Sequence, residues 1–405
     1  MRKLRVGVWV FEDYKPEKGG GFGYNSQLIN AMYNYNFAEA EIIFIAKKFS
    51  TNWEKSDKSY EIKTPDFKSP VLPFQYRVIK KIAGKLRLQT RPIDYTKEIS
   101  VNNEHLKEEL SKVVDIIYYP IPGCVIENFP YVYTLWDLGH FSMYAFPEVT
   151  MNQVFESRKQ HHDLFPQKAL MVFCESESGK KEVVQYLNLN PKRIKVVPLF
   201  PSEIINDKIN AEKPAAIVQD AFFIHYPAQF WSHKNHYNLL LTFKIVLLNF
   251  PNLKLIFSGS DKGNKKYVLQ LIDELKLTDS VLDLGFVKTE ELKWIYLHSQ
   301  GLVMPTFLGP TNMPLLEAAE LGCFVACSDL EGHKEQLGDY AYYFDPSNPK
   351  EMAQMIIEMI RDKQNKDIRI YNSTFNISNA LEKIDLAFSE IKNIRFCWGT
   401  NDKIY

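Results

Sequence analysis

The sequence has no long hydrophobic run and no excess of charge of one sign. A membrane-spanning helix needs about 20 consecutive apolar residues, and no stretch reaches that length. Lysine plus arginine number 49, as do aspartate plus glutamate, so the net charge does not indicate a nucleic-acid partner. The first apolar stretch, which ends before Glu12, is too short for a signal peptide. We therefore expect a cytoplasmic protein.

Cysteine is also scarce, with five residues scattered along the chain. Their odd number and wide spacing predict reduced thiols rather than disulfides. Cys323 and Cys327 are four residues apart, but no second pair of cysteine or histidine residues completes a zinc site. We therefore expect no metal.

What the sequence does contain is an alternation of short apolar runs and amphipathic segments over 405 residues. Strands are expected at 4–10, 42–46, 116–119, 131–135, 170–174, 194–197, 222–226, 254–258, 281–284, 301–304, 324–327 and 341–344. Helices are expected at 23–35, 178–187, 234–249, 265–275, 289–298, 313–321 and 377–391. This alternation predicts an α/β protein with parallel, doubly wound sheets.

The alternation restarts after a polar stretch at 202–214. We therefore expect two Rossmann-like domains, 1–205 and 206–379, that face a central cleft. Ligands of such sheets bind beyond the carboxyl ends of the strands, so the cleft is the predicted site.

The segment 74–91 carries six lysine or arginine residues and no acidic residue, with Val78, Ile82 and Leu86 at helical spacing. A basic amphipathic helix can bind an anionic membrane or a phosphate-bearing acceptor. The alternative is a solvated helix that packs on its own domain.

Gly20 and Gly21 belong to a glycine cluster between the first strand and the first helix. A backbone without side chains can approach a ligand closely, and a helix N-terminus attracts anions. The cluster does not match a nicotinamide-binding fingerprint, and a simple tight turn is an equal alternative.

Lys234 follows the first strand of the second domain and is expected to open the next helix. A cation opposes the helix dipole at that end, which hints at an anionic ligand such as a diphosphate.

A turn rich in glycine and proline precedes the helix expected from Met313. Thr311 and Asn312 can cap this helix or offer hydroxyl and amide contacts. Glu317 lies one turn inside among apolar residues, where a carboxylate needs a partner. It can accept the two hydroxyls of a ribose; the alternative is a surface glutamate.

Asp137 and His140 follow a strand of the first domain and are expected at the cleft. They are candidates for contacts to a sugar or a phosphate. For His140, a structural role is an equal alternative.

Together these segments resemble the retaining family-4 glycosyltransferases of the GT-B fold, over nearly the whole chain and most strongly over 222–346. The matching pieces include the glycine cluster, the segment 134–140, Ser176, Lys195–Pro198, Lys234–Asn235, Phe257–Ser260, Leu284–Phe286, Leu292–Tyr296, Pro305–Ala318, Leu321–Val325, Glu335 and Phe344–Pro346.

The resemblance implies metal-independent transfer of a hexose, of the mannosyl or rhamnosyl type, from a nucleotide-diphosphate sugar. The acceptor would be a glycan or a lipid-linked glycan in surface-polysaccharide synthesis, at the inner face of the membrane. No cofactor and no nucleic acid is implied, and the sequence also lacks a D-x-D metal-binding pair. The last helix, about 380–405, would return to the first domain.

The resemblance also assigns residues. Lys234 would contact the diphosphate, and Asp137 and His140 are the further catalytic candidates. Glu317 would hold the ribose. The remaining donor-binding positions are Gly20, Gly21, Gln229, Gly309, Thr311, Asn312 and Met313.

Three positions depart from the family pattern: Gln229 stands in place of an arginine, Gly309 in place of the first glutamate of the E-x7-E motif, and Trp136 in place of a histidine. These departures keep open a catalytically inactive GT-B protein that binds nucleotide sugars or acts as a scaffold. A nucleotide-sugar epimerase is a further alternative, but it would need an acid–base pair that the sequence does not display.

Overall fold

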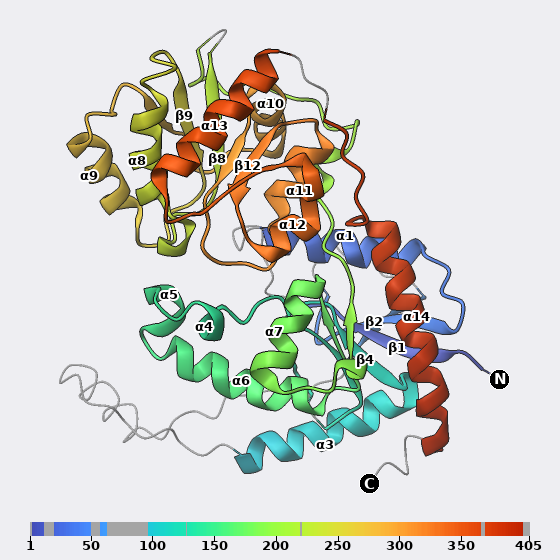
Figure 1. The fold of residues 1–405 in the computed structure, drawn as a ribbon. Helices are drawn as coiled ribbons and strands as arrows, with labels where there is room; N and C mark the ends of the chain where they lie inside the picture. The colour runs from blue at the N-terminus through green and yellow to red at the C-terminus, as the bar shows by residue number, and fades with distance from the viewer. Residues whose placement is uncertain are drawn as a thin grey trace.

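The computed structural model of the chain consists of two α/β lobes (Figure 1). It describes residues 2–11, 20–49, 57–62, 96–126, 128–218, 221–365 and 369–399. The basic segment 74–91 lies outside the described residues, so its role at a membrane or acceptor stays a prediction.

The first lobe is built on a seven-stranded parallel sheet with the order β3-β2-β1-β4-β5-β6-β7. Its strands are β1 (Leu4–Trp9), β2 (Ala40–Ala46), β3 (Ser59–Glu61), β4 (Ile116–Tyr119), β5 (Tyr131–Thr134), β6 (Met171–Cys174) and β7 (Ile194–Val196). Every residue of β4, β5 and β6 is buried. Strands of a parallel sheet that is covered on both faces have no solvent-exposed side chains, so β4, β5 and β6 appear in the sequence as short apolar runs.

The second lobe contains a six-stranded parallel sheet with the order β10-β9-β8-β11-β12-β13. Its strands are β8 (Phe223–Pro227), β9 (Lys254–Ser258), β10 (Val281–Asp283), β11 (Leu302–Met304), β12 (Val325–Ser328) and β13 (Tyr342–Phe344). In both sheets the strand order reverses beside the first strand, between β1 and β4 and between β8 and β11. Ligands of doubly wound sheets bind at such reversals.

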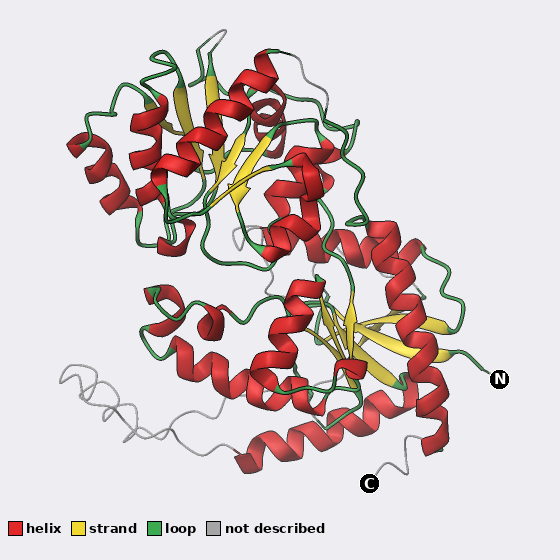
Figure 2. Ribbon diagram, in the orientation of Figure 1, coloured by secondary structure: helices red, strands yellow, loops and turns green. Residues whose placement is uncertain are grey.

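Helices cover both sheets (Figure 2). They are α1 (Gly20–Asn34), α3 (Thr96–Val113), α4 (Gly139–Ser142), α5 (Pro147–Thr150), α6 (Val154–Lys168), α7 (Glu177–Leu187), α8 (His236–Val246), α9 (Lys265–Glu274), α10 (Thr289–His298), α11 (Met313–Glu320), α12 (Glu331–Leu337), α13 (Pro349–Gln364) and α14 (Ile377–Arg395). The predicted α/β class with two doubly wound, Rossmann-like domains is confirmed.

Several features differ from the sequence-based expectations, which did not include β3, α3, α4, α5, α12 or α13. The helix expected from residue 234 begins at His236, because Lys234 ends a short 3-10 turn and Asn235, at a φ of 60°, caps α8. The dipole argument for an anion at Lys234 therefore does not apply. The sequence patterns also missed α6, whose buried residues are only His162 and Pro166, so the helix has no apolar stripe.

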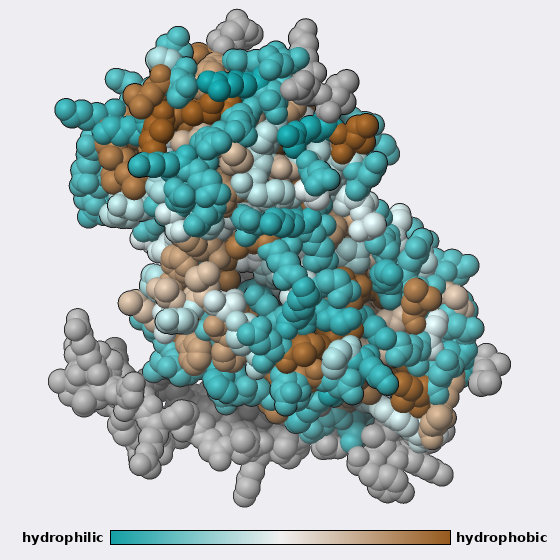
Figure 3. All heavy atoms as spheres, viewed as in Figure 1, coloured by the Kyte–Doolittle hydropathy of each residue, from teal (hydrophilic) through white to brown (hydrophobic). Residues whose placement is uncertain are grey.

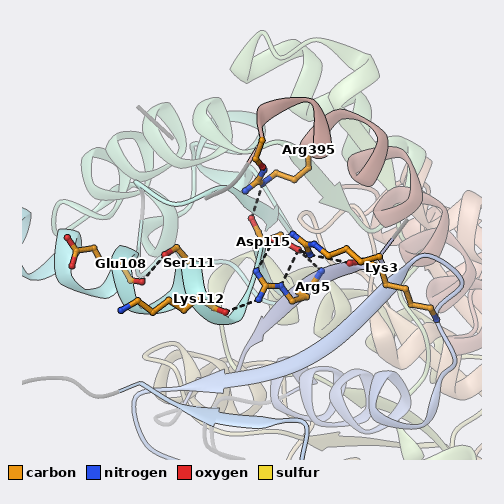
Figure 4. Close-up of polar contacts among 9 residues, drawn as sticks. Lys3, Arg5, Glu108, Ser111, Lys112, Asp115 and Arg395 are labelled. Carbon is orange, nitrogen blue, oxygen red and sulfur yellow. Dashed lines mark hydrogen bonds and ion pairs between the residues drawn. The ribbon is translucent and has the colours of Figure 1, made fainter. Parts of the chain in front are cut away.

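The last helix, α14, crosses back and packs on β1, β2, β7 and α1 of the first lobe (Figure 1). Phe388 lies in the apolar core there, with ring centroids 5.8 Å from Phe37 and 5.9 Å from Tyr118. At the end of the helix, the guanidinium of Arg395 donates to the backbone oxygen of Asp115 at 3.3 Å (Figure 4). Strand, helix and C-terminal segment therefore share one core.

The Asp115 carboxylate is itself buried and binds two arginines. It accepts from the Arg5 guanidinium at 3.1 Å (Figure 4). It also accepts from Arg2 at 2.5 and 2.9 Å. Burial alone would raise the pKa of Asp115, but the two guanidinium groups hold it far below its usual range. This cluster fixes the start of β1 to the start of β4.

Polar side chains cover most of the face in Figure 3, and apolar atoms gather at the waist between the lobes, on the side of α4 and α5. The cavity considered next opens between the two lobes.

Candidate active site

A cavity of about 500 Å³ separates the two lobes, and both contribute to its wall. The first lobe supplies Gly21, Tyr24, Trp136, Asp137, Glu148, Val149, Arg158, Glu175 and Leu199. The second supplies Trp231, His233, Lys234 and the segment 308–314. Among the predicted site residues, Gly21, Asp137, Lys234, Gly309, Thr311, Asn312 and Met313 come together here.

Lys234 is held in the cavity by a chain of hydrogen bonds. Its ammonium group donates to the side-chain oxygen of Asn312 at 3.1 Å. The amide nitrogen of Asn312 lies 2.9 Å from Nε2 of His333, whose Nδ1 lies 2.9 Å from the backbone oxygen of Ser328. Burial lowers the pKa of His333 to about 4, so its ring is neutral and can accept from Asn312 while donating to Ser328.

The Lys234 ammonium is only partly neutralised by its surroundings. Burial lowers its pKa to about 8, although the nearby carboxylate of Asp137 favours the charged form. Burial makes the charged form of this lysine unfavourable, and a negatively charged ligand beside it would stabilise that form. Such a lysine is therefore a candidate for binding an anion.

The loop before α11 is held in a glycine-dependent conformation. Gly309 has a φ of +117°, a region that other residues rarely adopt. Gln336 of α12 accepts from the Asn312 backbone N–H at 2.9 Å and donates to its carbonyl at 3.2 Å. A side chain at Gly332 would meet the Pro310 carbonyl oxygen at 1.4 Å. A glutamate side chain at position 309 would therefore be strained in this loop conformation.

Helix N-termini from both lobes lie at the cavity. α1 begins at Gly20, next to the lining residue Gly21, and α11 begins at Met313. Neither helix has an acidic residue in its first turn, and Asn312 makes no side-chain capping bond to α11. Both ends can therefore attract a negatively charged ligand.

Asp137 faces the cavity but is paired with a cation that the sequence did not single out. Its carboxylate accepts from Arg158 of α6 at 2.5 Å and from the Gly139 N–H at 2.9 Å. Burial would raise the pKa of Asp137, but these contacts outweigh it and lower the pKa. Asp137 is therefore ionised at neutral pH and cannot serve there as a proton donor, while Arg158 adds a second cation to the cavity wall.

His140 is not brought to the cavity wall. It is fully buried in α4, stacked on His162 at 5.1 Å, and neither ring nitrogen has a hydrogen-bond partner. Burial lowers its pKa to about 3, so the ring is neutral at physiological pH. The expected position of His140 at the cleft is corrected: the chain turns into α4 after Asp137 and carries this side chain inward.

Glu317 is 5% exposed and already has partners. Its two carboxylate oxygens accept from the hydroxyl of Ser202 and, at 3.0 Å, from that of Tyr296. These contacts supply the partner that its apolar flanks require, and they leave accepting capacity for further hydroxyls. Glu317 is not on the cavity wall described above, and its ribose role stays a prediction.

Gln229 is likewise outside the cavity wall. Its side-chain oxygen accepts from the Trp231 indole N–H at 3.0 Å, and Trp231 does line the cavity. Gln229 therefore acts on the wall through Trp231.

A direct contact between the lobes closes one side of the cavity. The Glu148 carboxylate accepts from the backbone N–H of His233 at 2.8 Å and lies 2.6 Å from its Nδ1. Burial lowers the pKa of His233 even though Glu148 opposes this effect. This pair could not be predicted from local sequence patterns, because its members are 85 positions apart.

Within the described ranges, no group of three or more histidine, cysteine, aspartate or glutamate side chains is arranged to hold a metal ion. No helix in the same ranges combines the length and the hydropathy needed to cross a bilayer.

The chain is similar to known glycosyltransferases in sequence and in fold. Residues 207–374 match the family model of the glycosyl transferases group 1. Over 208 residues the chain is 23% identical to O-antigen chain mannosyltransferase B of Escherichia coli, a match that covers 49% of this chain and 54% of that protein. The chain thus spans about half the length of the curated relatives it matches.

Two solved structures share the whole architecture. Sucrose-phosphate synthase from Thermosynechococcus elongatus has a TM-score of 0.61 at 16% identity, covering 98% of this chain and 100% of its own. HepE from Anabaena in complex with UDP-glucose has a TM-score of 0.58 at 16% identity, covering 96% of this chain and 100% of its own. At such identities these similarities establish the fold.

Proposed function

We propose that this chain, which has the fold of GT-B glycosyltransferases and matches the glycosyl transferases group 1 model over residues 207–374, is a retaining, metal-independent hexosyltransferase of the family-4-like type. The donor would be a nucleotide-diphosphate sugar, and the acceptor a glycan or a lipid-linked glycan in surface-polysaccharide synthesis. The mannosyltransferase relative supports this direction. Retention is proposed from the family resemblance alone.

The observation that carries the proposal is the anion site in the cavity between the lobes. Lys234, held by Asn312, lies on the same cavity wall as the start of α11 and faces the α1 end of the first lobe. A departing diphosphate would be stabilised by this ammonium group and by the two helix ends. Removing one such contact typically lowers the rate by about two to three orders of magnitude.

The test is to follow release of nucleoside diphosphate from UDP-glucose and GDP-mannose, with and without EDTA. Wild type should release nucleoside diphosphate from one of the two donors, also in the presence of EDTA. Lys234→Ala and Glu317→Ala should each lose most turnover while remaining folded. Normal turnover in both variants would contradict the site. The anomeric configuration of the product, determined by NMR, tests retention.

A catalytically inactive, nucleotide-sugar-binding protein is the second candidate. Gln229 and the positive φ of Gly309 favour it, because two family contacts to the donor are absent. Binding of a nucleotide sugar with neither hydrolysis nor transfer would support this candidate.

We further propose that the enzyme works in the cytoplasm at the inner face of the membrane. Flotation of the purified protein with anionic phosphatidylglycerol vesicles, abolished by removing the charges of the segment 74–91, would support this location.

A further inference from the structure

Three carboxyl side chains line the cavity, and two of them are occupied by protein partners. Asp137 is paired with Arg158, and Glu148 binds His233. Glu175, directly after β6, makes no ion pair among the described residues. The Thr311 hydroxyl lies close enough to lower its pKa, but without a fully formed hydrogen bond.

The surroundings of Glu175 disfavour its charge. Burial raises the pKa of Glu175 to about 8, the carboxylates of Asp137 and Glu182 act in the same direction, and only Thr311 opposes them. The lysine and the arginine on the cavity wall are engaged elsewhere, Arg158 with Asp137 and Lys234 with Asn312. An unpaired carboxyl in such a place is unfavourable in the empty protein, which points to a ligand that uses it.

The position of Glu175 limits what that ligand group can be. Glu175 lies beside Thr311, one residue from the start of the anion site at Asn312 and α11. The ionised carboxylate would repel a phosphate, whereas the protonated carboxyl that the raised pKa favours can both donate to and accept from a hydroxyl group. An uncharged group that can hydrogen-bond therefore fits both forms of Glu175. In a nucleotide-diphosphate sugar, the part that is next to the phosphates and rich in hydroxyl groups is the transferred sugar.

We infer that Glu175 binds a hydroxyl group of the donor sugar from the first lobe, beside Thr311 of the loop at 309–313, and helps determine which sugar is accepted. The inference rests on the proposed function and refines it by adding a contact from the first lobe to the donor sugar.

The experiment compares binding of UDP with UDP-glucose and of GDP with GDP-mannose by calorimetry in wild type, Glu175→Ala and Glu175→Gln. The affinity for the free diphosphate should stay unchanged in both variants. The affinity for the matching nucleotide sugar should fall about tenfold in Glu175→Ala, as expected for the loss of a hydrogen bond of about 1.4 kcal/mol. Glu175→Gln should lose less, because the amide still hydrogen-bonds.

Glu320→Gln is the matched control. Glu320 also has a pKa raised by burial, but it ends α11 and is not on the cavity wall, so both affinities should stay as in wild type. If Glu175→Ala loses equal affinity for the diphosphate and for the nucleotide sugar, or loses affinity for neither, the sugar contact is overturned. A wild type that binds none of UDP, GDP, ADP, CDP and dTDP or their sugars would overturn the proposed function itself.

Discussion

At the scale of single residues, the buried ammonium group of Lys234 lowers the stability of the folded protein but is suited to binding an anion. The pKa of Lys234 is lowered to about 8 by burial, so between pH 8 and its ordinary value of 10.5 the unfolded chain binds more protons than the folded protein. Stability therefore rises with pH across that window, and below it the burial penalty is fully present. A buried ammonium without an anion destabilises the empty protein.

We predict that Lys234→Met raises Tm at pH 7 in the absence of ligand, by about 2 to 4 °C for each 1 kcal/mol of relieved penalty. The same variant should show no thermal stabilisation by nucleoside diphosphate. In wild type, that stabilisation should weaken as pH rises through about 8. Lys244→Met, on the exposed side of α8, is the control, and equal behaviour of the two variants would contradict this role of Lys234.

Asn312 gives a second prediction at this scale. Asn312→Asp has nearly the same shape, but it places a carboxylate beside Lys234 and loses the N–H group that meets His333. Affinity for nucleoside diphosphate should fall at least about tenfold, as for the loss of one good charged contact. Asn348→Asp, at the N-cap of α13 where aspartate is equally suitable, should bind like wild type. Calorimetry that shows no difference between these two variants would refute the role of Asn312.

At the scale of elements, α14 belongs energetically to the first lobe although it ends the chain. Phe388→Ala removes a fully buried ring from that core, so the free energy of unfolding should fall by about 3 to 5 kcal/mol. Leu386→Ala, on the same helix but 66% exposed, should change it by less than about 0.5 kcal/mol. Urea denaturation measures both, and a small effect of Phe388→Ala would mean that α14 is not part of the core.

The elements also show what the sequence could and could not predict. Buried strands such as β4 and β5 were predictable because parallel strands carry continuous apolar runs. The loop around Gly309 was located correctly, since glycine and proline mark turns. The sequence did not reveal that α12 supports this loop through Gln336 and His333, because nothing local to those residues indicates a contact 24 or 21 positions away. Arg158, Glu175 and the pair Glu148–His233 were missed for the same reason.

At the scale of the whole molecule, the two lobes are joined by a contact between helices. The carboxylate of Glu335 in α12 accepts from the backbone N–H groups of Glu177 and Ser178 at 2.7 and 3.0 Å. These groups open α7 of the first lobe, where a negative charge is favoured by the helix dipole. This contact is one of those that hold the lobes around the cavity, together with the Glu148–His233 contact.

We predict that Glu335→Gln weakens the closed arrangement by about 1 to 3 kcal/mol, because it removes a charge-assisted contact and one of its two acceptors. Small-angle X-ray scattering should then give a larger radius of gyration than wild type. Glu331→Gln loses only the exposed ion pair with Lys181, which contributes about 0 to 1 kcal/mol. An unchanged radius in Glu335→Gln would show that other contacts alone hold the lobes together.

The central claim is that the cavity between the lobes binds a nucleotide-diphosphate sugar without a metal. The most direct test is the thermal shift of the protein with UDP, GDP, ADP, CDP and dTDP and their common sugars, with and without EDTA. We predict that one nucleotide and its sugar raise Tm whether or not EDTA is present, by an amount equivalent to about 2.7 kcal/mol at a hundredfold excess over Kd. If no nucleotide raises Tm, or if EDTA abolishes the rise, the claim is contradicted.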